Sequence, residues 1–269
     1  GAAFAASGEA ALTGELAVCA GSCGPGNLHL INGLYDANRT GAPVLAIASH
    51  IPSKQIGTGF FQETHPEAIF QECSGYCEMV NSAEQGGVVL HHAIQSTMAG
   101  NGVSVLVIPG DVSMQDAEDD SFVESKISAG RPVVFPDPAE AAALTQAINE
   151  AESVTLFVGA GVKDAREQVL KLAEKIKAPI GHALGGKMYI QYENPFDVGM
   201  NGLLGYGAAH EATHEADLPI LLGTDFPYND FLPDANVAQV DINGSHIGRR
   251  TKISYPVTGD VAATLENIL

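Results

Sequence analysis

The most constraining feature of the sequence is a short apolar run that ends in two glycines, from Val154 to Gly161. An apolar, β-rich run that closes in Gly-x-Gly predicts a buried strand whose tip turns sharply into a helix, which we place at 162–177. Such a turn directs free backbone N–H groups and the positive end of a helix dipole outward. Asp164 stands where the third glycine of the dinucleotide fingerprint would fall. Taken alone, the turn is therefore either structural or a seat for a phosphate-bearing cofactor.

Apolar runs alternate with helical patterns along most of the chain. This alternation predicts the α/β class, with parallel sheets that are covered by helices. The predicted strands are 15–20, 44–49, 74–80, 103–108, 154–158, 178–183, 218–222 and 237–242. The predicted helices are 27–38, 83–99, 139–152, 162–177 and 208–216. Ligands of open parallel sheets bind outside the carboxyl ends of the strands, and several of these ends carry glycine or short polar residues.

The alternating pattern disappears between Val112 and Pro138. Acidic residues crowd 116–120 and several prolines follow, a composition that is typical of a linker. The 269 residues leave room for two domains that each bury a core of their own. We therefore predict a first domain at 1–111, a linker at 112–138 and a second domain at 139–269.

Composition excludes some classes of function. The formal net charge of −19 argues against nucleic acid as a partner and against a basic membrane-binding patch. No run of about 18 apolar residues is present to span a bilayer. The four cysteines form two Cys-x3-Cys pairs, which do not match the Cys-x2-Cys zinc knuckle, so we expect buried, reduced thiols. The chain opens on Gly-Ala-Ala-Phe, as if inside a helix, and we expect it to be part of a longer protein.

One motif suggests a different class of protein. His210, Glu211 and His214 satisfy His-Glu-x-x-His, which on a helix places two imidazoles on one face for zinc and a glutamate as general base. A zinc hydrolase also needs a third ligand and an open position for water. Asp217 and Ile220 stand where the extended metalloprotease motif requires glycine and histidine. Two solvated histidines on a surface helix are the favoured interpretation, and a zinc hydrolase is the alternative.

Four segments together resemble a known family. They are Cys-Ala-Gly-Ser-Cys-Gly-Pro-Gly-Asn at 19–27, Phe-Phe-Gln-Glu-Thr-His-Pro at 60–66, Pro-Gly-Asp at 109–111 and Gly-Thr-Asp-Phe-Pro-Tyr at 223–228. The chain closely resembles, over its whole length, the pyruvate:quinone oxidoreductases of the thiamine diphosphate- and FAD-dependent pyruvate oxidase family. The resemblance implies part of a pyrimidine-binding domain at 1–111 and a Rossmann-like FAD-binding central domain at 139–269. It also implies that the activating glutamate, the domain that binds Mg²⁺ and diphosphate, and a C-terminal membrane-binding helix lie outside this sequence.

The activity implied by the resemblance is oxidative decarboxylation of pyruvate to acetate and CO₂, with electrons passing through FAD to a membrane quinone. The implied assembly is a homotetramer in the cytoplasm, peripheral to the inner face of the cell membrane. Without the missing parts we expect this chain alone to be inactive. An acetolactate synthase-like carboligase that keeps FAD as a structural group is the alternative within thiamine chemistry, and a remnant without activity or flavin is another.

The resemblance also implies roles for individual residues. Phe61 and Gln62 match catalytic loop residues that reach the thiamine site across a subunit interface, where Gln62 would hydrogen-bond the substrate and Phe61 would exclude water. Ordinary packing is the alternative for Phe61, and His65 is left unassigned. Pro25, Gly26 and Asn27 match the turn near the thiamine pyrimidine, for which a purely structural turn is the alternative. No metal ligand is predicted. The implied FAD contacts are Gly159, Gly161, Gly185, Lys187, Asn201, Gly202, Leu203, Leu204, Thr224, Asp225, Phe226, Pro227, Tyr228, Asp241, Ile242 and Asn243.

Overall fold

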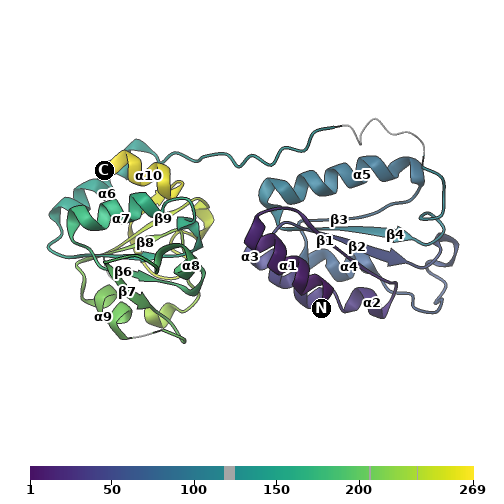
Figure 1. Cartoon of the computed structure of the whole chain (residues 1–269), viewed down its shortest axis with the longest axis horizontal. Coiled ribbons are helices and arrows are strands. Elements are labelled where there is room, and N and C mark those ends of the chain that lie inside the picture. Colours follow the sequence, from purple (N-terminus) through teal and green to yellow (C-terminus); the bar gives the residue numbers. More distant parts are fainter. Residues whose placement is uncertain (118–124, 206, 235) are drawn as a thin grey trace. The chain divides into compact units, whose positions relative to one another are not determined.

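The computed structural model describes residues 1–117, 125–205, 207–234 and 236–269 (Figure 1). The chain divides into two compact units, Gly1–Arg131 and Pro132–Leu269. This division falls within the predicted linker, whose residues 118–124, including part of its acidic cluster, lie outside the described residues. Each unit contains one parallel sheet with helices on its faces, which confirms the predicted α/β class.

The sheet of the first unit has the strand order β1-β2-β4-β3. Its strands are β1 (Ala17–Gly21), β2 (Val44–His50), β3 (Tyr76–Met79) and β4 (Val103–Pro109). Its helices are α1 (Ala2–Thr13), α2 (Pro25–Leu28), α3 (Ile31–Thr40), α4 (Pro66–Phe70) and α5 (Ala83–Ser96). Short helical turns are η1 (Ser53–Gln55), η2 (Gln71–Cys73) and η3 (Thr97–Asn101).

Both faces of this sheet are buried because successive side chains of a strand point to opposite faces. Leu45 and Leu106 lie in one apolar cluster with Val89 of α5. Their neighbours Ala46 and Val105 lie in another, which includes residues of α1 and α3. The near-continuous apolar runs of β2 and β4 follow from this two-sided burial.

The second unit has six parallel strands in the order β10-β9-β8-β5-β6-β7. Its strands are β5 (Val154–Val158), β6 (Ile180–His182), β7 (Asp197–Met200), β8 (Leu218–Leu222), β9 (Val237–Asp241) and β10 (Ile253–Thr258). Its helices are α6 (Pro138–Glu150), α7 (Arg166–Ile176), α8 (Lys187–Ile190), α9 (Gly207–Glu215) and α10 (Val261–Ile268). Short turns are η5 (Ala160–Val162), η6 (Leu184–Gly186), η7 (Asn229–Phe231) and η8 (Gly244–His246).

Read from β7, the strands of this unit follow the 3-2-1-4-5-6 order of doubly wound dinucleotide-binding folds. The helices α6, α7 and α10 cover one face of the sheet, and α9 lies on the other (Figure 1). Leu156 and Val158 of β5 pack on the face that α6, α7 and α10 cover, whereas Phe157 between them packs on the opposite face. The order of the strands reverses between β5 and β8, which is where such folds bind ligands.

Several element boundaries differ from the sequence prediction for local reasons. The helix predicted at 162–177 begins only at Arg166, because the 3₁₀ turn η5 and the non-helical residue Ala165 precede it. The helix predicted at 27–38 is two helices, and the first begins at Pro25, which is well suited to the first helical position. The edge strands β7 and β10 were not predicted, since their partly exposed sequences lack a continuous apolar run.

Glycine makes the strand reversal possible by bringing two turns together. The backbone N–H of Gly161 donates to the carbonyl oxygen of Gly223 at 2.9 Å. A Cβ atom added to Gly161 would lie 2.6 Å from the Cα of Gly223, and one added to Gly159 would lie 2.5 Å from the Gly223 oxygen. Gly223 itself has a φ of +57°. The Gly-x-Gly motif therefore serves the contact between the turns after β5 and β8.

We predict that Gly161→Ala destabilises the second unit by about 1–3 kcal/mol, because a methyl group there overpacks against backbone. Gly185→Ala is the matched control, since its Cβ would meet Ala160 at ordinary van der Waals distances, 3.5 Å from its Cβ and 3.9 Å from its backbone nitrogen. The measurement is urea denaturation of the whole chain, with the second unit followed through hydrogen exchange of β8. Equal midpoints for the two variants would contradict this account.

Candidate functional site

A pocket of about 350 Å³ lies at the carboxyl edge of the second sheet, where β5 and β8 diverge. The turns after β5, β6 and β8 and the segment after β7 all contribute to it. The lining residues are Gly159, Ala160, Ala183, Leu184, Gly185, Met200, Asn201, Leu203, Leu204, Gly223, Thr224, Asp225, Phe226, Pro227 and Tyr228. A concave site in this position is the expected ligand site of a doubly wound sheet.

The pocket is largely apolar, and some of its apolar side chains are exposed. Leu184, Leu203 and Leu204 expose 63%, 69% and 73% of their surface. On the inner side, Phe226 is buried and packs edge-on against Phe157, with ring centroids 5.1 Å apart, and against Tyr228 at 5.4 Å. Clustered exposed leucines beside a rigid aromatic wall indicate a surface that contacts an apolar ligand.

Two buried polar residues shape the pocket. The Nδ2 of Asn201 donates to the carbonyl oxygen of Phe231 at 3.0 Å, and its Oδ1 accepts from the N–H of Gly202 at 2.8 Å. Asn201 thereby ties the segment after β7 to the turn η7. Thr224 is also buried, directly after Gly223 in the turn that follows β8. Asn201 therefore fixes the segment that carries the exposed Leu203 and Leu204.

Asp225, at the rim of the pocket, is held by two arginines. Arg250 binds it through two hydrogen bonds, Nε to Oδ1 at 2.9 Å and Nη2 to Oδ2 at 3.2 Å, and Arg249 adds a third at 3.0 Å. Burial raises the pKa of Asp225, but the hydrogen bond and charge of Arg250, with the charge of Arg249, outweigh it and hold the pKa below its ordinary value. Neither arginine belongs to a recognised motif, although two adjacent arginines are conspicuous in a chain with only 13 lysines and arginines.

The predicted FAD contacts fall into two groups along the carboxyl edge of the sheet. Those that line the pocket are Gly159, Gly185, Asn201, Leu203, Leu204, Thr224, Asp225, Phe226, Pro227 and Tyr228. Those outside its lining are Gly161, Lys187, Gly202, Asp241, Ile242 and Asn243. The strand ends also contribute Ala160, Ala183, Leu184 and Met200, which carry no motif that sequence reasoning could have used.

The residues outside the pocket have partners of their own. The Nζ of Lys187, the first residue of α8, donates to the Oε1 of Gln191, which directly follows this helix. Asp241 is buried at the end of β9, where its Oδ1 accepts from the N–H of Asn243 at 2.9 Å and lies 3.5 Å from Nδ1 of His246. Ile242, in contrast, exposes 52% of its surface next to this buried carboxylate.

In the first unit, the predicted thiamine turn is tightly built. Asn27 is fully buried, and its Nδ2 donates to the carbonyl oxygen of Ser49 at the end of β2, at 2.8 Å. Its Oδ1 is buried without a hydrogen-bond partner among the described residues. Pro25 is exposed and Gly26 is partly exposed. The backbone of the turn is thus accessible, while the Asn27 side chain holds it to the sheet.

The predicted catalytic pair lies beside this turn. Gln62 has a positive φ of +65°, and its Cβ and carbonyl oxygen press against Gly24, where an added Cβ would lie 2.9 Å from the Gln62 Cβ. The thiol of Cys23 donates to Oε1 of Gln62 at 3.4 Å. Phe61 exposes 79% of its surface, so it does not pack in the core of its unit. The structure therefore brings Gln62 and the predicted thiamine turn together.

The two histidines of the predicted His-x3-His motif lie on one helix. His210 and His214 lie on α9 with ring centroids 4.0 Å apart, and Nδ1 of His214 lies 2.9 Å from the carbonyl oxygen of His210. Among the described residues, no group of three or more histidine, cysteine, aspartate or glutamate side chains is placed to hold a metal ion. The third ligand of the zinc hydrolase alternative is therefore not found in the described part of the chain.

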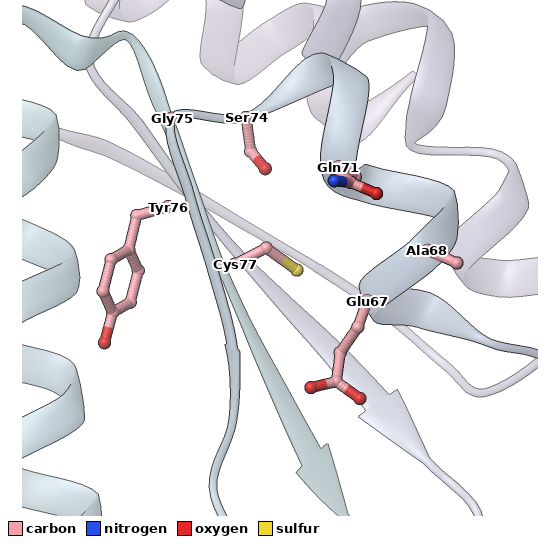
Figure 2. Close-up of a pocket in the computed structure, with 7 residues that line it drawn as sticks. All are labelled: Glu67, Ala68, Gln71, Ser74, Gly75, Tyr76 and Cys77. Carbon is pink, nitrogen blue, oxygen red and sulfur yellow. The ribbon is translucent and has the colours of Figure 1, made fainter.

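A second hollow, of about 540 Å³, lies between α4 and β3 in the first unit (Figure 2). Cys77 and Glu67 point toward it, whereas Tyr76 points away on the other side of the strand (Figure 2). Burial, helped by the charges of Glu67 and Glu78, raises the pKa of the Cys77 thiol to about 12. The hollow therefore presents a protonated thiol at neutral pH, and none of the predicted site residues lines it.

The four cysteines are free thiols, of which Cys19 and Cys73 are buried and Cys23 and Cys77 partly so. This agrees with the expected reduced state, although burial is complete for only two of them. Within the described residues, no helix combines the length and apolar character needed to cross a bilayer.

Each of the two units matches a domain of a known protein family. The model of the thiamine pyrophosphate enzyme N-terminal TPP binding domain matches residues 1–69, and that of the central domain of the same enzymes matches residues 141–268. An uncharacterized 42.6 kDa protein of Pseudomonas amyloderamosa, from the isoamylase 3′ region, is 52% identical over 269 residues, which is 100% of this chain and 68% of that protein. The chain belongs to the thiamine pyrophosphate enzyme family.

Enzymes with different names are among its more distant relatives. The pyruvate oxidase of Lactiplantibacillus plantarum is 30% identical over 272 residues, or 99% of this chain and 45% of the enzyme. The acetolactate synthase of Mycobacterium leprae is 31% identical over 278 residues, or 100% of this chain and 44% of the enzyme. The chain thus spans less than half the length of these two enzymes.

We predict that Asp225→Asn lowers the stability of the second unit at pH 7 by about 1 kcal/mol, because it removes the charge that both arginines bind. Since the pKa of Asp225 is depressed in the folded state, its contribution is present above the unfolded-state pKa and is lost as the pH falls through the folded-state value. Urea midpoints of the two proteins should therefore converge in acid.

Asp230→Asn is the control, since no side-chain hydrogen bond or ion pair joins Asp230 to the other described residues, and its urea midpoint at pH 7 should equal that of the parent chain. A constant gap between Asp225→Asn and the parent chain from neutral to acid pH would contradict the ion-pair account.

Proposed function

We propose that the second unit binds FAD along the carboxyl edge of its sheet, as part of an FAD- and thiamine diphosphate-dependent enzyme that oxidatively decarboxylates pyruvate. The observation that carries this proposal is the apolar pocket at the point where the strand order reverses between β5 and β8. A flat, largely apolar ring system matches the exposed leucines and the aromatic wall of Phe226 and Tyr228. When bound, a flavin supplies two-electron transfer.

The edge beyond the pocket suits the rest of a dinucleotide. Asp241 and Asn243 lie at the end of β9, the neighbour of β8, so an extended ligand that starts in the pocket can run toward them. Asp241 is positioned at a strand end, where a carboxylate can accept from a ribose hydroxyl. Arg249 and Arg250 bring positive charge to the same edge through their contact with Asp225. The residues present therefore fit the group.

For the first unit, we propose that Pro25 and Gly26 line the thiamine site and that Asn27 keeps their turn in place. The partnerless Oδ1 of the buried Asn27 is an acceptor beside this turn. Thiamine diphosphate supplies the decarboxylation of 2-oxo acids. The amide of Gln62 can donate to the carboxylate of pyruvate, and Phe61 can exclude water from it. On the same resemblance, Mg²⁺ would be held by residues outside this sequence.

An acetolactate synthase-like carboligase, with FAD as a structural group, is the second candidate. The 31% identity to an acetolactate synthase, beside 30% to a pyruvate oxidase, supports it as strongly as the first. The Phe-Gln-Glu-Thr-His-Pro and Gly-Thr-x-Phe-Pro-Tyr segments favour the quinone-linked oxidoreductase by resemblance. On the same resemblance we propose a homotetramer in the cytoplasm, at the inner face of the membrane, that passes electrons to a quinone.

The first test measures the binding of FAD to this chain, with the quenching of flavin fluorescence as the readout. Leu204→Asp should weaken binding by about tenfold to a hundredfold, because an exposed charge replaces an apolar contact with the ring. Met188→Asp is the matched control, as Met188 exposes 59% of its surface in the same unit but does not line the pocket. Equal affinity of the two variants, or no binding to the parent chain, would contradict the proposed site.

The second test separates oxidation from carboligation in the complete enzyme that this proposal implies. With pyruvate as substrate, we expect reduction of a soluble quinone analogue with release of acetate. Formation of acetolactate without quinone reduction would instead support the carboligase.

A further inference from the structure

The loop between β2 and α4, residues 51–65, is anchored at its start by a carboxylate. Asp111, which follows β4, accepts a hydrogen bond from the backbone N–H of Ser53 at 2.7 Å and a second from the Ser53 hydroxyl. These bonds hold the pKa of Asp111 below its usual range. The first residues of the loop are thereby fixed to the carboxyl end of the first sheet.

A second carboxylate closes the far part of the loop. The Oε1 of Glu63 accepts from the backbone N–H of Gly57, and its Oε2 accepts from those of Gly59, at 2.6 Å, and Phe60, at 3.1 Å. Glu63 also donates its own backbone N–H to the carbonyl oxygen of Phe60 at 2.9 Å. Both oxygens of one side chain thus bind three amides of the same short segment.

This closure sets the position of the two residues just before Glu63. Phe61 and Gln62 lie between Phe60, which Glu63 binds, and Glu63 itself. The φ of +65° at Gln62 is rare for a residue with a side chain. Such a conformation persists only where the surroundings determine it. The bonds of Glu63 on one side and the contact with Gly24 on the other provide those surroundings.

We propose that Glu63 is a positioning residue: its carboxylate, bound to the amides of residues 57, 59 and 60, fixes the loop that presents Phe61 and Gln62. The proposal rests on the proposed function only for the role of Phe61 and Gln62. The geometry of the loop stands without it.

The hydrogen bond from Gly57, with those from Gly59 and Phe60 and the charge of His65, lowers the pKa of Glu63. His50, buried at the end of β2, and His65, in the same loop, are the other titratable groups that face it. Burial lowers the pKa of His50, while the negative charge of Glu63 opposes this shift. At pH values above the pKa of Glu63, its ionised carboxylate should therefore hold the loop in place. The loop should become more mobile as the pH falls through that pKa.

The test uses this chain with Phe61→Trp, because the sequence has no tryptophan and the new residue is a single reporter at the loop tip. Glu63→Ala, Glu63→Gln and, as control, Glu67→Gln are introduced beside it. Glu67 is a carboxylate in the first turn of the adjacent helix α4 and takes no part in the loop bonds. Fluorescence anisotropy reports loop order, and NMR hydrogen exchange reports the amides of residues 57, 59 and 60.

With Glu63→Ala, we expect those three amides to exchange at least about tenfold faster and the anisotropy of the tryptophan to fall. Glu63→Gln keeps a single acceptor oxygen, so it should protect only some of these three amides from exchange. In the chain with Glu63, anisotropy should fall with acid, and in Glu63→Gln this pH dependence should be absent. Glu67→Gln should behave as the parent.

Unchanged amide exchange and unchanged anisotropy in Glu63→Ala would overturn the proposal. A fall of anisotropy in acid that persists in Glu63→Gln would also overturn it, because the transition would then belong to the histidines. None of these readouts uses flavin, thiamine or turnover. A failure of FAD binding therefore counts against the proposed function alone, and a failure here counts against the role of Glu63 alone.

Discussion

The contact between the turns after β5 and β8 is the constraint on which the second unit depends. Gly159 and Gly161 lie directly against Gly223 and Thr224, so a side chain at either of the two glycines would collide with this neighbouring turn. Because the turns meet so closely, the sheet can reverse its strand order without a gap in its core. The space above the contact becomes the pocket that is lined by Leu203, Leu204 and Phe226.

Carboxylates that bind backbone N–H groups or arginine recur in both units and explain part of the negative charge of the chain. Asp111 and Glu63 anchor the loop that follows β2, and Asp217 accepts from the N–H groups of Glu152 and Ser153 ahead of β5. Asp225 binds two arginines at the rim of the pocket. The negative charge of the chain, which argues against nucleic acid as a partner, therefore also stabilises loops: Asp111 and Glu63 in the first unit, and Asp217 and Asp225 in the second.

The sequence predicted the buried strands well because residues packed on both faces leave uninterrupted apolar runs, as in β4, β5 and β8. It missed β7 and β10 because polar residues, glycine and proline interrupt these partly exposed strands, which therefore lack that signal. The glycines predicted the turns at the pocket, and the structure shows that Gly159 and Gly161 allow one turn to pack closely on another. Their contact with FAD stays a prediction. The roles of Glu63, Arg249 and Arg250 could not be predicted, because no sequence motif indicates which residues they contact in the fold.

We propose that this chain binds FAD at the carboxyl edge of the second sheet, where the strand order reverses. The most direct measurement is mapping of amide chemical shifts during titration with FAD. The account predicts that the amides of Gly159, Gly185, Leu204 and Thr224 shift together with a single affinity. Shifts confined to the first unit, for example around the hollow between α4 and β3, would contradict it.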